Sequence, residues 1–231
     1  MCHVLDPASH DSAHRRLADA VEPLRRERLG HAADVLAAAL ADDPGFRHLF
    51  PDGRRREREL RAMYRMTLAD TLRHGRAFVT VRDGEITGAL ALYPPGTYPM
   101  SAARWLRLAP QLAVLAARTR AHAPGLIRFG DLTSGGVPRD SWYVEALGVR
   151  PDLQRQGRGR RLMAEVFTLV DAEEGRGYLE TTKRGNVEYY RSLGYEPVGE
   201  PVPLAADGPW IFRMARAAVR RHDARELASA S

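Results

Sequence analysis

The chain has 231 residues, of which 44% are hydrophobic and 28% are charged. This composition provides enough apolar surface for a folded core, which excludes an intrinsically disordered or collagen-like chain. No apolar run reaches the roughly 18 residues that a membrane-spanning helix needs. The first residues also lack the apolar stretch of a secretory signal. We therefore expect a cytoplasmic protein with no membrane partner, built as one large domain.

Cysteine, histidine and arginine limit the possible partners. The single cysteine, Cys2, cannot form an intrachain disulfide, and the eight histidines are scattered, so we expect no metal site. The formal net charge is +6, and clustered arginine is the electrostatic signature of phosphate binding. A noncatalytic nucleic-acid-binding protein that uses residues 54–61 and 155–161 is therefore an alternative from another functional class. Nothing in the sequence indicates an oligomeric state.

The N-terminal half begins with an irregular segment. Residues 1–20 show no hydrophobic period and are predicted to form a flexible extension, whereas residues 21–218 are predicted to form the domain and 219–231 a tail. Apolar spacing predicts a helix from His31 to the stop signal at 42–45. A second helix is predicted from Arg54 to Gly75. A β-hairpin is expected over 78–92, because Asp-Gly at 83–84 provides the positive φ of a tight turn.

Residues 97–140 are predicted to form a helical insertion. One helical face continues through Leu108 and Leu112, but Pro110 is expected to kink or split that helix. Residues 123–125, Ala-Pro-Gly, are expected to end it, and residues 133–138 are expected to form a loop. Insertions between scaffold elements often carry binding residues, so this segment is expected to form a wall of the functional site.

The C-terminal half shows a clearer pattern. A strand over 142–149, a helix over 159–174 and a strand over 178–181 predict a parallel βαβ unit. A short helix is expected over 186–193, closed by Gly194. Strands at 195–198 and 210–214 are predicted to complete the sheet.

A glycine loop separates the first strand of this unit from its helix. Gln154, Gly157 and Gly159 have the spacing Q-x-x-G-x-G. Glycines leave the backbone N–H groups uncovered at a helix N-terminus, where the helix dipole favours an anion such as pyrophosphate. The arginines that crowd this end, which the dipole disfavours, also indicate an anion. The loop therefore predicts a phosphate-binding site.

Other interpretations of the loop are weaker. A dinucleotide-binding fold requires a third glycine where Leu162 stands, although Glu180 could imitate its ribose-binding acid. A nucleotide-hydrolase P-loop requires Gly-Lys-Ser/Thr, which is absent. An ordinary helix start with a charged first turn does not explain the crowding of arginines.

Two segments together resemble the GNAT superfamily of acetyl-CoA-dependent N-acetyltransferases. GVRPDLQRQGRGRRL matches the V-x-P-x-x-Q-x-x-G-x-G pattern of its motif A, and LETTKRGNVEYYRSLGY at 179–195 resembles the puromycin N-acetyltransferase-like branch. The resemblance implies a single α/β domain with the GNAT fold: a mixed, mostly antiparallel central sheet with helices on both faces, splayed where Val149 diverges. It also implies transfer of acetyl from acetyl-CoA to an amine.

The resemblance assigns roles to particular residues. Asn186 would bond the pantetheine, and Tyr190 would give a proton to the departing thiolate; their spacing of four matches the puromycin-type branch, whereas many members have seven. The main chains of Leu147, Gly148 and Val149 would pair with the pantetheine like a further strand. The backbone N–H groups that would hold the coenzyme A pyrophosphate are those of Arg155, Gln156, Gly157, Arg158, Gly159 and Arg160.

The general base and the acceptor stay open. Glu145 is the first choice for the base, because many family members carry a glutamate two residues before the position of Leu147. Glu180 or water is the alternative base. Glu145 would then only pair with an arginine. Family analogy suggests a small cationic or aminonucleoside antibiotic as the acceptor. A protein N-terminus and a polyamine stay possible, although a net-positive protein should not attract polycations.

Overall fold

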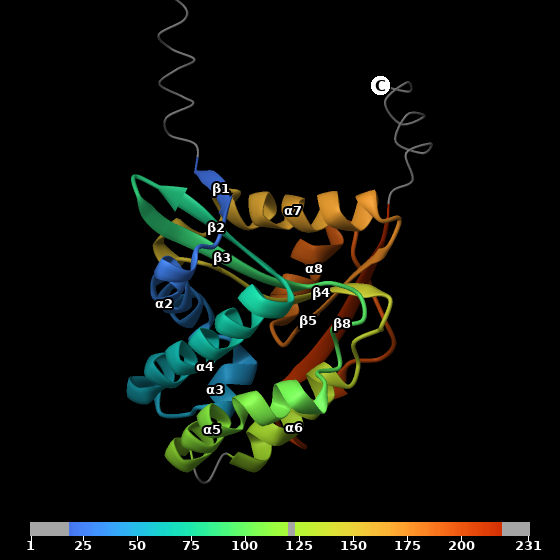
Figure 1. Cartoon of the computed structure of the whole chain (residues 1–231). Coiled ribbons are helices and arrows are strands. Elements are labelled where there is room, and N and C mark those ends of the chain that lie inside the picture. The colour runs from blue at the N-terminus through green and yellow to red at the C-terminus, as the bar shows by residue number, and fades with distance from the viewer. Residues whose placement is uncertain (1–18, 120–122, 219–231) are drawn as a thin grey trace, which may run out of the picture.

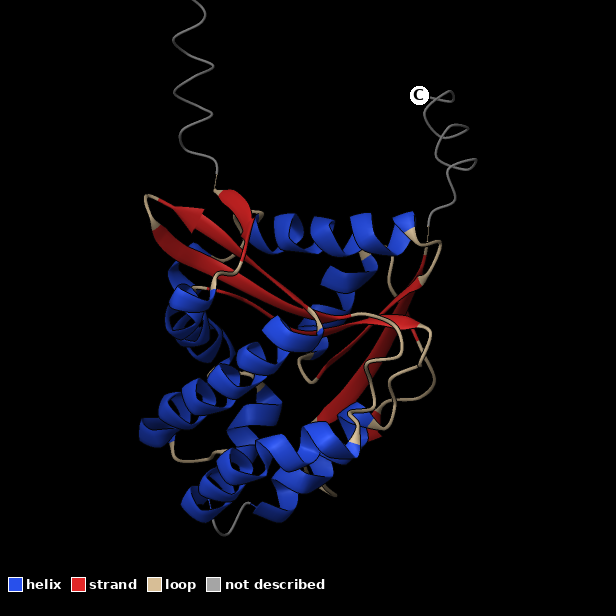
Figure 2. Ribbon diagram, in the orientation of Figure 1, coloured by secondary structure: helices blue, strands red, loops and turns tan. Residues whose placement is uncertain are grey.

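The computed structural model describes residues 19–119 and 123–218. It shows a mixed α/β fold around an eight-stranded, mostly antiparallel sheet with the order β1-β2-β3-β4-β5-β8-β6, in which β7 pairs with β8 (Figures 1 and 2). The predicted fold class is confirmed. The elements are β1 (Ala20–Pro23), α2 (Leu29–Leu40), α3 (Pro44–Leu49), α4 (Gly53–His74), β2 (Arg76–Arg82), β3 (Glu85–Tyr93), α5 (Ala102–Thr119), α6 (Ala123–Ser134), β4 (Ser141–Val149), α7 (Arg158–Ala172), β5 (Arg176–Thr181), α8 (Arg184–Arg191), β6 (Glu196–Pro197), β7 (Val202–Pro203) and β8 (Trp210–Ala217).

The sheet is covered by helices on both faces (Figure 1). On one face, α2 and α4 pack in a core that includes Leu36, Leu60 and Leu68, all fully buried. On the other face, α7 and α8 pack in a core that includes Leu162 and Met163. Apolar residues at helical spacing on α4 and α7 therefore face the sheet, as their periodicity predicts.

The predicted hairpin and βαβ unit are both present. Strands β2 and β3 join through Asp83 and Gly84, whose φ angles of +51° and +81° are those of the predicted tight turn. Strands β4 and β5 pair in parallel, from Ser141 opposite Arg176 to Val144 opposite Leu179. The two strands part after Val144, not at Val149 as the resemblance implied, so a longer part of β4 is free of β5.

The sheet begins one residue before the predicted start of the domain, in a short strand that the sequence did not indicate. Ala20 begins β1, which pairs with β2 in antiparallel register, so the sheet starts inside the segment expected to be a flexible extension. Asp19, just before it, is buried beside Arg158. Four residues, AVEP, are too few for an alternating pattern to identify a strand. The rest of the expected extension (1–18) and the expected tail (219–231) lie outside the described residues.

Prolines that were expected only to end helices also begin new ones. The helix α2 ends at Leu40, before 42–45 as predicted, but Pro44 then begins α3, and Ala123 begins α6. A helix needs no N–H donor in its first turn, so proline is accepted there. Pro110 does not split α5, which runs from Ala102 to Thr119. It lies on the exposed side, where water can satisfy the carbonyl that its missing N–H leaves.

In the described residues, no helix combines the length and apolar character that crossing a membrane would require.

Candidate active site

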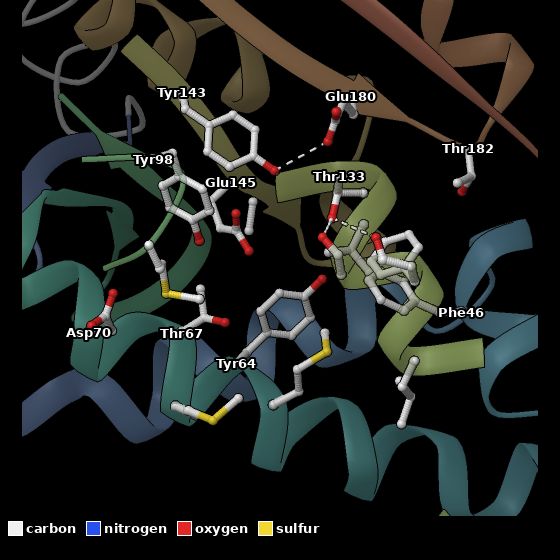
Figure 3. Close-up of a pocket in the computed structure, with 18 of the residues that line it drawn as sticks. Phe46, Tyr64, Thr67, Asp70, Tyr98, Thr133, Tyr143, Glu145, Glu180 and Thr182 are labelled. Atoms are coloured by element: carbon white, nitrogen blue, oxygen red, sulfur yellow. Dashed lines mark hydrogen bonds between the residues drawn. The ribbon is translucent and has the colours of Figure 1, made fainter. Parts of the chain in front are cut away.

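A cavity of about 650 Å³ opens where β4 and β5 part (Figure 3). The sheet side of its wall comes from β4, β5 and α8, and the opposite side comes from α4, α5 and α6. The segment 97–140, predicted to form a site wall, thus supplies residues such as Leu108 and Phe129 to the lining. The volume lies within the range of about 300–1,000 Å³ that is usual for small-molecule sites.

Glu145 reaches the cavity through an irregularity in β4. Val144 lies opposite Leu92 and Ala146 lies opposite Ala91, so Glu145 has no partner in the register of β3. Such a β-bulge changes the direction in which a side chain points. Figure 3 shows the Glu145 carboxyl group beside Tyr98 and facing the open space. Burial raises the pKa of Glu145, and the hydroxyl groups of Tyr143 and Tyr98 oppose this rise.

Glu180 lies near the end of β5, on the same cavity. Its carboxylate accepts hydrogen bonds from the Tyr178 hydroxyl at 3.0 Å and from the Tyr143 hydroxyl at 3.4 Å, and Nε of Arg213 lies 3.8 Å away. Burial raises the pKa of Glu180 to about 8, and the nearby charge of Glu145 adds to the rise against the opposing effects of Tyr178 and Arg213. The carboxyl group is therefore largely neutral at pH 7.

Asn186 and Tyr190 lie on one face of α8 and both line the cavity, as their spacing predicts. Asn186 Nδ2 donates to Thr181 Oγ1 at 3.3 Å, which holds the amide beside the end of β5. Tyr190 is buried, and burial raises the pKa of its phenol well above the usual value. The phenol is therefore protonated at neutral pH and available as a proton donor.

One edge of β4 is open beside these residues. Leu147, Gly148 and Val149 pair with β3 on one side, opposite Leu90, Ala89 and Gly88. In the described part of the chain no strand pairs with their other side, since the β5 register ends at Val144. Gln154 Nε2 donates to the Val149 carbonyl at 3.1 Å and marks the end of this edge. An extended ligand with amide groups could pair there as a strand does.

The open edge leads to the glycine turn that begins α7. Gly157 caps the helix with φ +83°, Arg155 has φ +59°, and no side chain caps the helix. Within residues 19–119 and 123–218, no acceptor lies on the backbone N–H groups from Arg155 to Arg160. Consecutive unpaired N–H groups in such a turn form an anion-binding site. The predicted phosphate cradle therefore has the expected backbone shape.

The side chains of the second arginine cluster have a different use from the one expected. Arg158 is buried and forms an ion pair with Asp19, and it also donates to the Leu153 carbonyl at 3.1 Å. Arg161 donates to the Asp19 carbonyl at 2.9 Å. These two arginines fasten the glycine turn to the start of the sheet, so an anion is not needed to explain them. Arg155 and Arg160 are exposed.

The first arginine cluster is also engaged within the protein. Arg56 donates to the carbonyls of Phe50 and Ala41 at 2.7 and 3.1 Å, and Arg61 lies 2.6 Å from Asp34. Because these arginines are paired within the protein, they are less available to bind the phosphates of a nucleic acid.

Several cavity residues were missed at the level of sequence. Asp43, Asp70, Tyr98 and Tyr143 all line the site. Each comes from a different element, and no local spacing links them. Asp43 stood in a stretch interpreted only as a helix stop; its carboxylate accepts from Gly45 N at 2.9 Å and from the Thr182 hydroxyl. A capping aspartate before Pro-Gly was the signal that could have found it.

Comparison with known proteins agrees with this geometry. Residues 110–197 match the family model described as an acetyltransferase (GNAT) domain. A Corynebacterium glutamicum structure described as "histone acetyltransferase HPA2 and related acetyltransferase" is similar at 22% identity and a TM-score of 0.66, covering 88% of this chain and 99% of that one. The ribosomal-protein-S18-alanine N-acetyltransferase of Escherichia coli is similar at 16% identity and a TM-score of 0.50, covering 87% and 96%. A Drosophila melanogaster polyamine N-acetyltransferase is similar at 15% identity and a TM-score of 0.50, covering 87% of this chain and 100% of that one.

The structural similarities establish the shared fold, and the matched segment contains the glycine turn, Glu145, Glu180, Asn186 and Tyr190. Residues 110–197 therefore match a GNAT acetyltransferase domain, and this match supports an enzyme, an N-acetyltransferase.

Proposed function

We propose that the chain transfers the acetyl group of acetyl-CoA to the amine of a small, antibiotic-like molecule. The observation that carries the proposal is the open edge of β4, which runs from Glu145 at the cavity to the glycine turn at the start of α7. The resemblance of LETTKRGNVEYYRSLGY to the puromycin-type branch supports the choice of a small molecule.

The residues present fit acetyl-CoA in three respects. The N–H groups from Arg155 to Arg160 suit a pyrophosphate, because they are unpaired at a helix N-terminus. The free edge at Leu147, Gly148 and Val149 suits the amides of pantetheine. Asn186 offers a polar group beside that edge. When bound, acetyl-CoA supplies an activated thioester carbonyl.

In the proposed reaction the protein moves two protons. Glu145 accepts a proton from the acceptor ammonium, which frees the lone pair for attack on the carbonyl carbon. A backbone N–H near Leu147 stabilises the negative charge that develops on oxygen. As the carbon–sulfur bond breaks, Tyr190 donates its phenolic proton to the sulfur, and the second proton that leaves the nitrogen restores the phenol. Attack is direct, so no acetylated protein forms.

Calorimetric titration tests the cofactor site. Acetyl-CoA is expected to bind more tightly than S-acetylpantetheine, which has the thioester but lacks the pyrophosphate. Equal affinity for the two would contradict the role of the glycine turn. Binding of DNA or RNA that weakens steeply with salt, without any response to acetyl-CoA, would favour the nucleic-acid alternative.

Thiol release in the presence of amines tests the transfer itself. A screen should include small cationic amines, peptides with a free N-terminus and polyamines. Acetylation of peptides alone would replace the small-molecule acceptor by a protein N-terminus.

A further inference from the structure

The charge of the cavity wall is opposite to that of the whole chain. Among the residues that the structure describes, 19–119 and 123–218, five acidic residues and no lysine, arginine or histidine line the cavity, whereas the chain carries a net charge of +6. Coulomb energy falls with distance and with solvent screening, so a bound amine responds to the wall around it more than to the distant arginines. The cavity therefore favours a cation, and the net charge is not an argument against one.

Most of these acids already have partners or face solvent. Asp70 forms a buried ion pair with Arg104 and accepts from the Tyr93 hydroxyl at 2.8 Å. Asp43 caps α3 and accepts the Thr182 hydroxyl. Asp131 is exposed. Glu180 is held by Tyr178 and Tyr143. Glu145 also interacts with the hydroxyl groups of Tyr143 and Tyr98, but it lies at the bulge beside the free edge of β4, so we take it as the carboxylate that receives the ammonium group.

The wall opposite Glu145 is mostly apolar and contains flexible residues. Met63 and Met66 of α4 face the cavity, and methionine adapts to irregular apolar ligands. From the insertion come Trp105, Leu108 and Ile127. Trp105 and Ile127 are 41% and 67% exposed, unusually high for such large apolar side chains, and a ligand in the cavity would cover them.

From this arrangement we propose that the acceptor is a monoamine whose single cationic group is attached to a bulky, aromatic or branched apolar body. The amine lies at Glu145, and the body lies between α4 and the helices α5 and α6. A second cation on the body would meet mostly apolar side chains, because Asp70 is already paired with Arg104 and Asp131 faces solvent, and this is unfavourable for a charge taken out of water. Polyamines and diamines are therefore poor acceptors. The inference rests on the proposed acetyl transfer and narrows its acceptor.

Matched amines test this inference. The probes are 4-phenylbutylamine and 1,4-diaminobutane, which share the same aliphatic spacer, and kcat/KM is measured by thiol release. We expect 4-phenylbutylamine to be preferred by at least about tenfold, the usual effect of filling an apolar pocket. Equal or better use of 1,4-diaminobutane would overturn the inference while leaving acetyl transfer intact. Failure of acetyl-CoA to bind would overturn the proposed function and the inference with it.

A pair of variants on α5 adds a second, independent test. Leu108→Glu places a carboxylate on the apolar wall, whereas Leu106→Glu places one on the same helix at a side chain that is 77% exposed and outside the lining. We expect only Leu108→Glu to shift the kcat/KM ratio toward 1,4-diaminobutane, by about tenfold or more. An unchanged ratio in a folded Leu108→Glu variant would contradict the proposed location of the apolar body.

Discussion

Replacement of Glu180 by glutamine is expected to stabilise the protein at alkaline pH and to have little effect at acid pH. Burial raises the pKa of Glu180 from 4.5 to about 8. A folded-state pKa above the unfolded one means that the folded protein holds the proton more tightly. The contribution of the Glu180 proton to the free energy of unfolding is therefore complete below pH 4.5 and is lost as the pH rises through 8. Glutamine has no such proton to lose.

The size of the effect follows from the shift. One pKa unit corresponds to 1.36 kcal/mol, so a rise from 4.5 to about 8 gives a loss of roughly 4 kcal/mol between pH 5 and pH 9. The Glu180 side chain is only 5% exposed, so solvent screens this effect little. In the wild type, the free energy of unfolding should fall by about this amount relative to the variant.

Urea unfolding of both proteins at several pH values measures this difference directly. Glu188→Gln is the matched control, because Glu188 is 74% exposed on the neighbouring helix α8. Its curve should run parallel to that of the wild type. Parallel curves for Glu180→Gln as well would show that Glu180 ionises normally, and the reasoning from its burial would be refuted.

Three further changes probe other parts of the site. Tyr190→Phe should lower kcat by about 10²-fold to 10⁴-fold with little change in the KM for acetyl-CoA. Tyr195→Phe, which changes a buried tyrosine outside the cavity lining, should leave kcat unchanged. Full kcat in Tyr190→Phe would make Tyr190 a packing residue. Gly159→Val should weaken acetyl-CoA binding in calorimetry, because a Cβ there would lie 2.9 Å from the Tyr189 hydroxyl at the proposed phosphate cradle. Gly53→Val, in the first turn of α4, should leave that affinity unchanged. Unchanged affinity in a folded Gly159→Val protein would exclude the cradle. Asp19→Asn should lower the free energy of unfolding by about 3 kcal/mol in urea, because it leaves Arg158 buried without its counter-charge, and a loss below 1 kcal/mol would contradict that ion pair's role.

The sequence was most informative where a local pattern determines the structure. The turn at Asp83 and Gly84, the parallel βαβ unit and the glycine turn before α7 each depend on neighbouring residues, and the structure contains all of them. Proline was less informative, because the same residue ends one helix and begins another. Pro44 and Pro124 stand in the first turns of α3 and α6, where the tertiary fold needs new helices.

The cavity wall could not be predicted in the same way. Asp70 of α4 meets Arg104 of α5, 34 positions away, and no spacing rule connects them. The role of Arg158 was hidden for the same reason, since its partner Asp19 lies 139 positions away. Sequence therefore indicated the proposed cofactor side of the site, which is built from consecutive residues. It gave little about the proposed acceptor side, to which α4, α5 and α6 bring residues that are far apart in the chain.

The identity of the base depends on this assembled environment, because two glutamates share one cavity. Burial raises the pKa of both Glu145 and Glu180, so protonation does not separate them. Glu145 is the expected base because it stands two residues before Leu147, on the strand whose free edge is proposed to hold the thioester. Glu145→Gln should lower kcat/KM by about 10²-fold at pH 7 and recover partly as the pH rises, because the amine then loses its proton to water. Glu180→Gln should change kcat/KM little at pH 7, as should Glu59→Gln, a buried glutamate outside the cavity lining. The opposite ranking would make Glu180 the base, and two small effects would show that water removes the proton, since neither carboxylate would then be required.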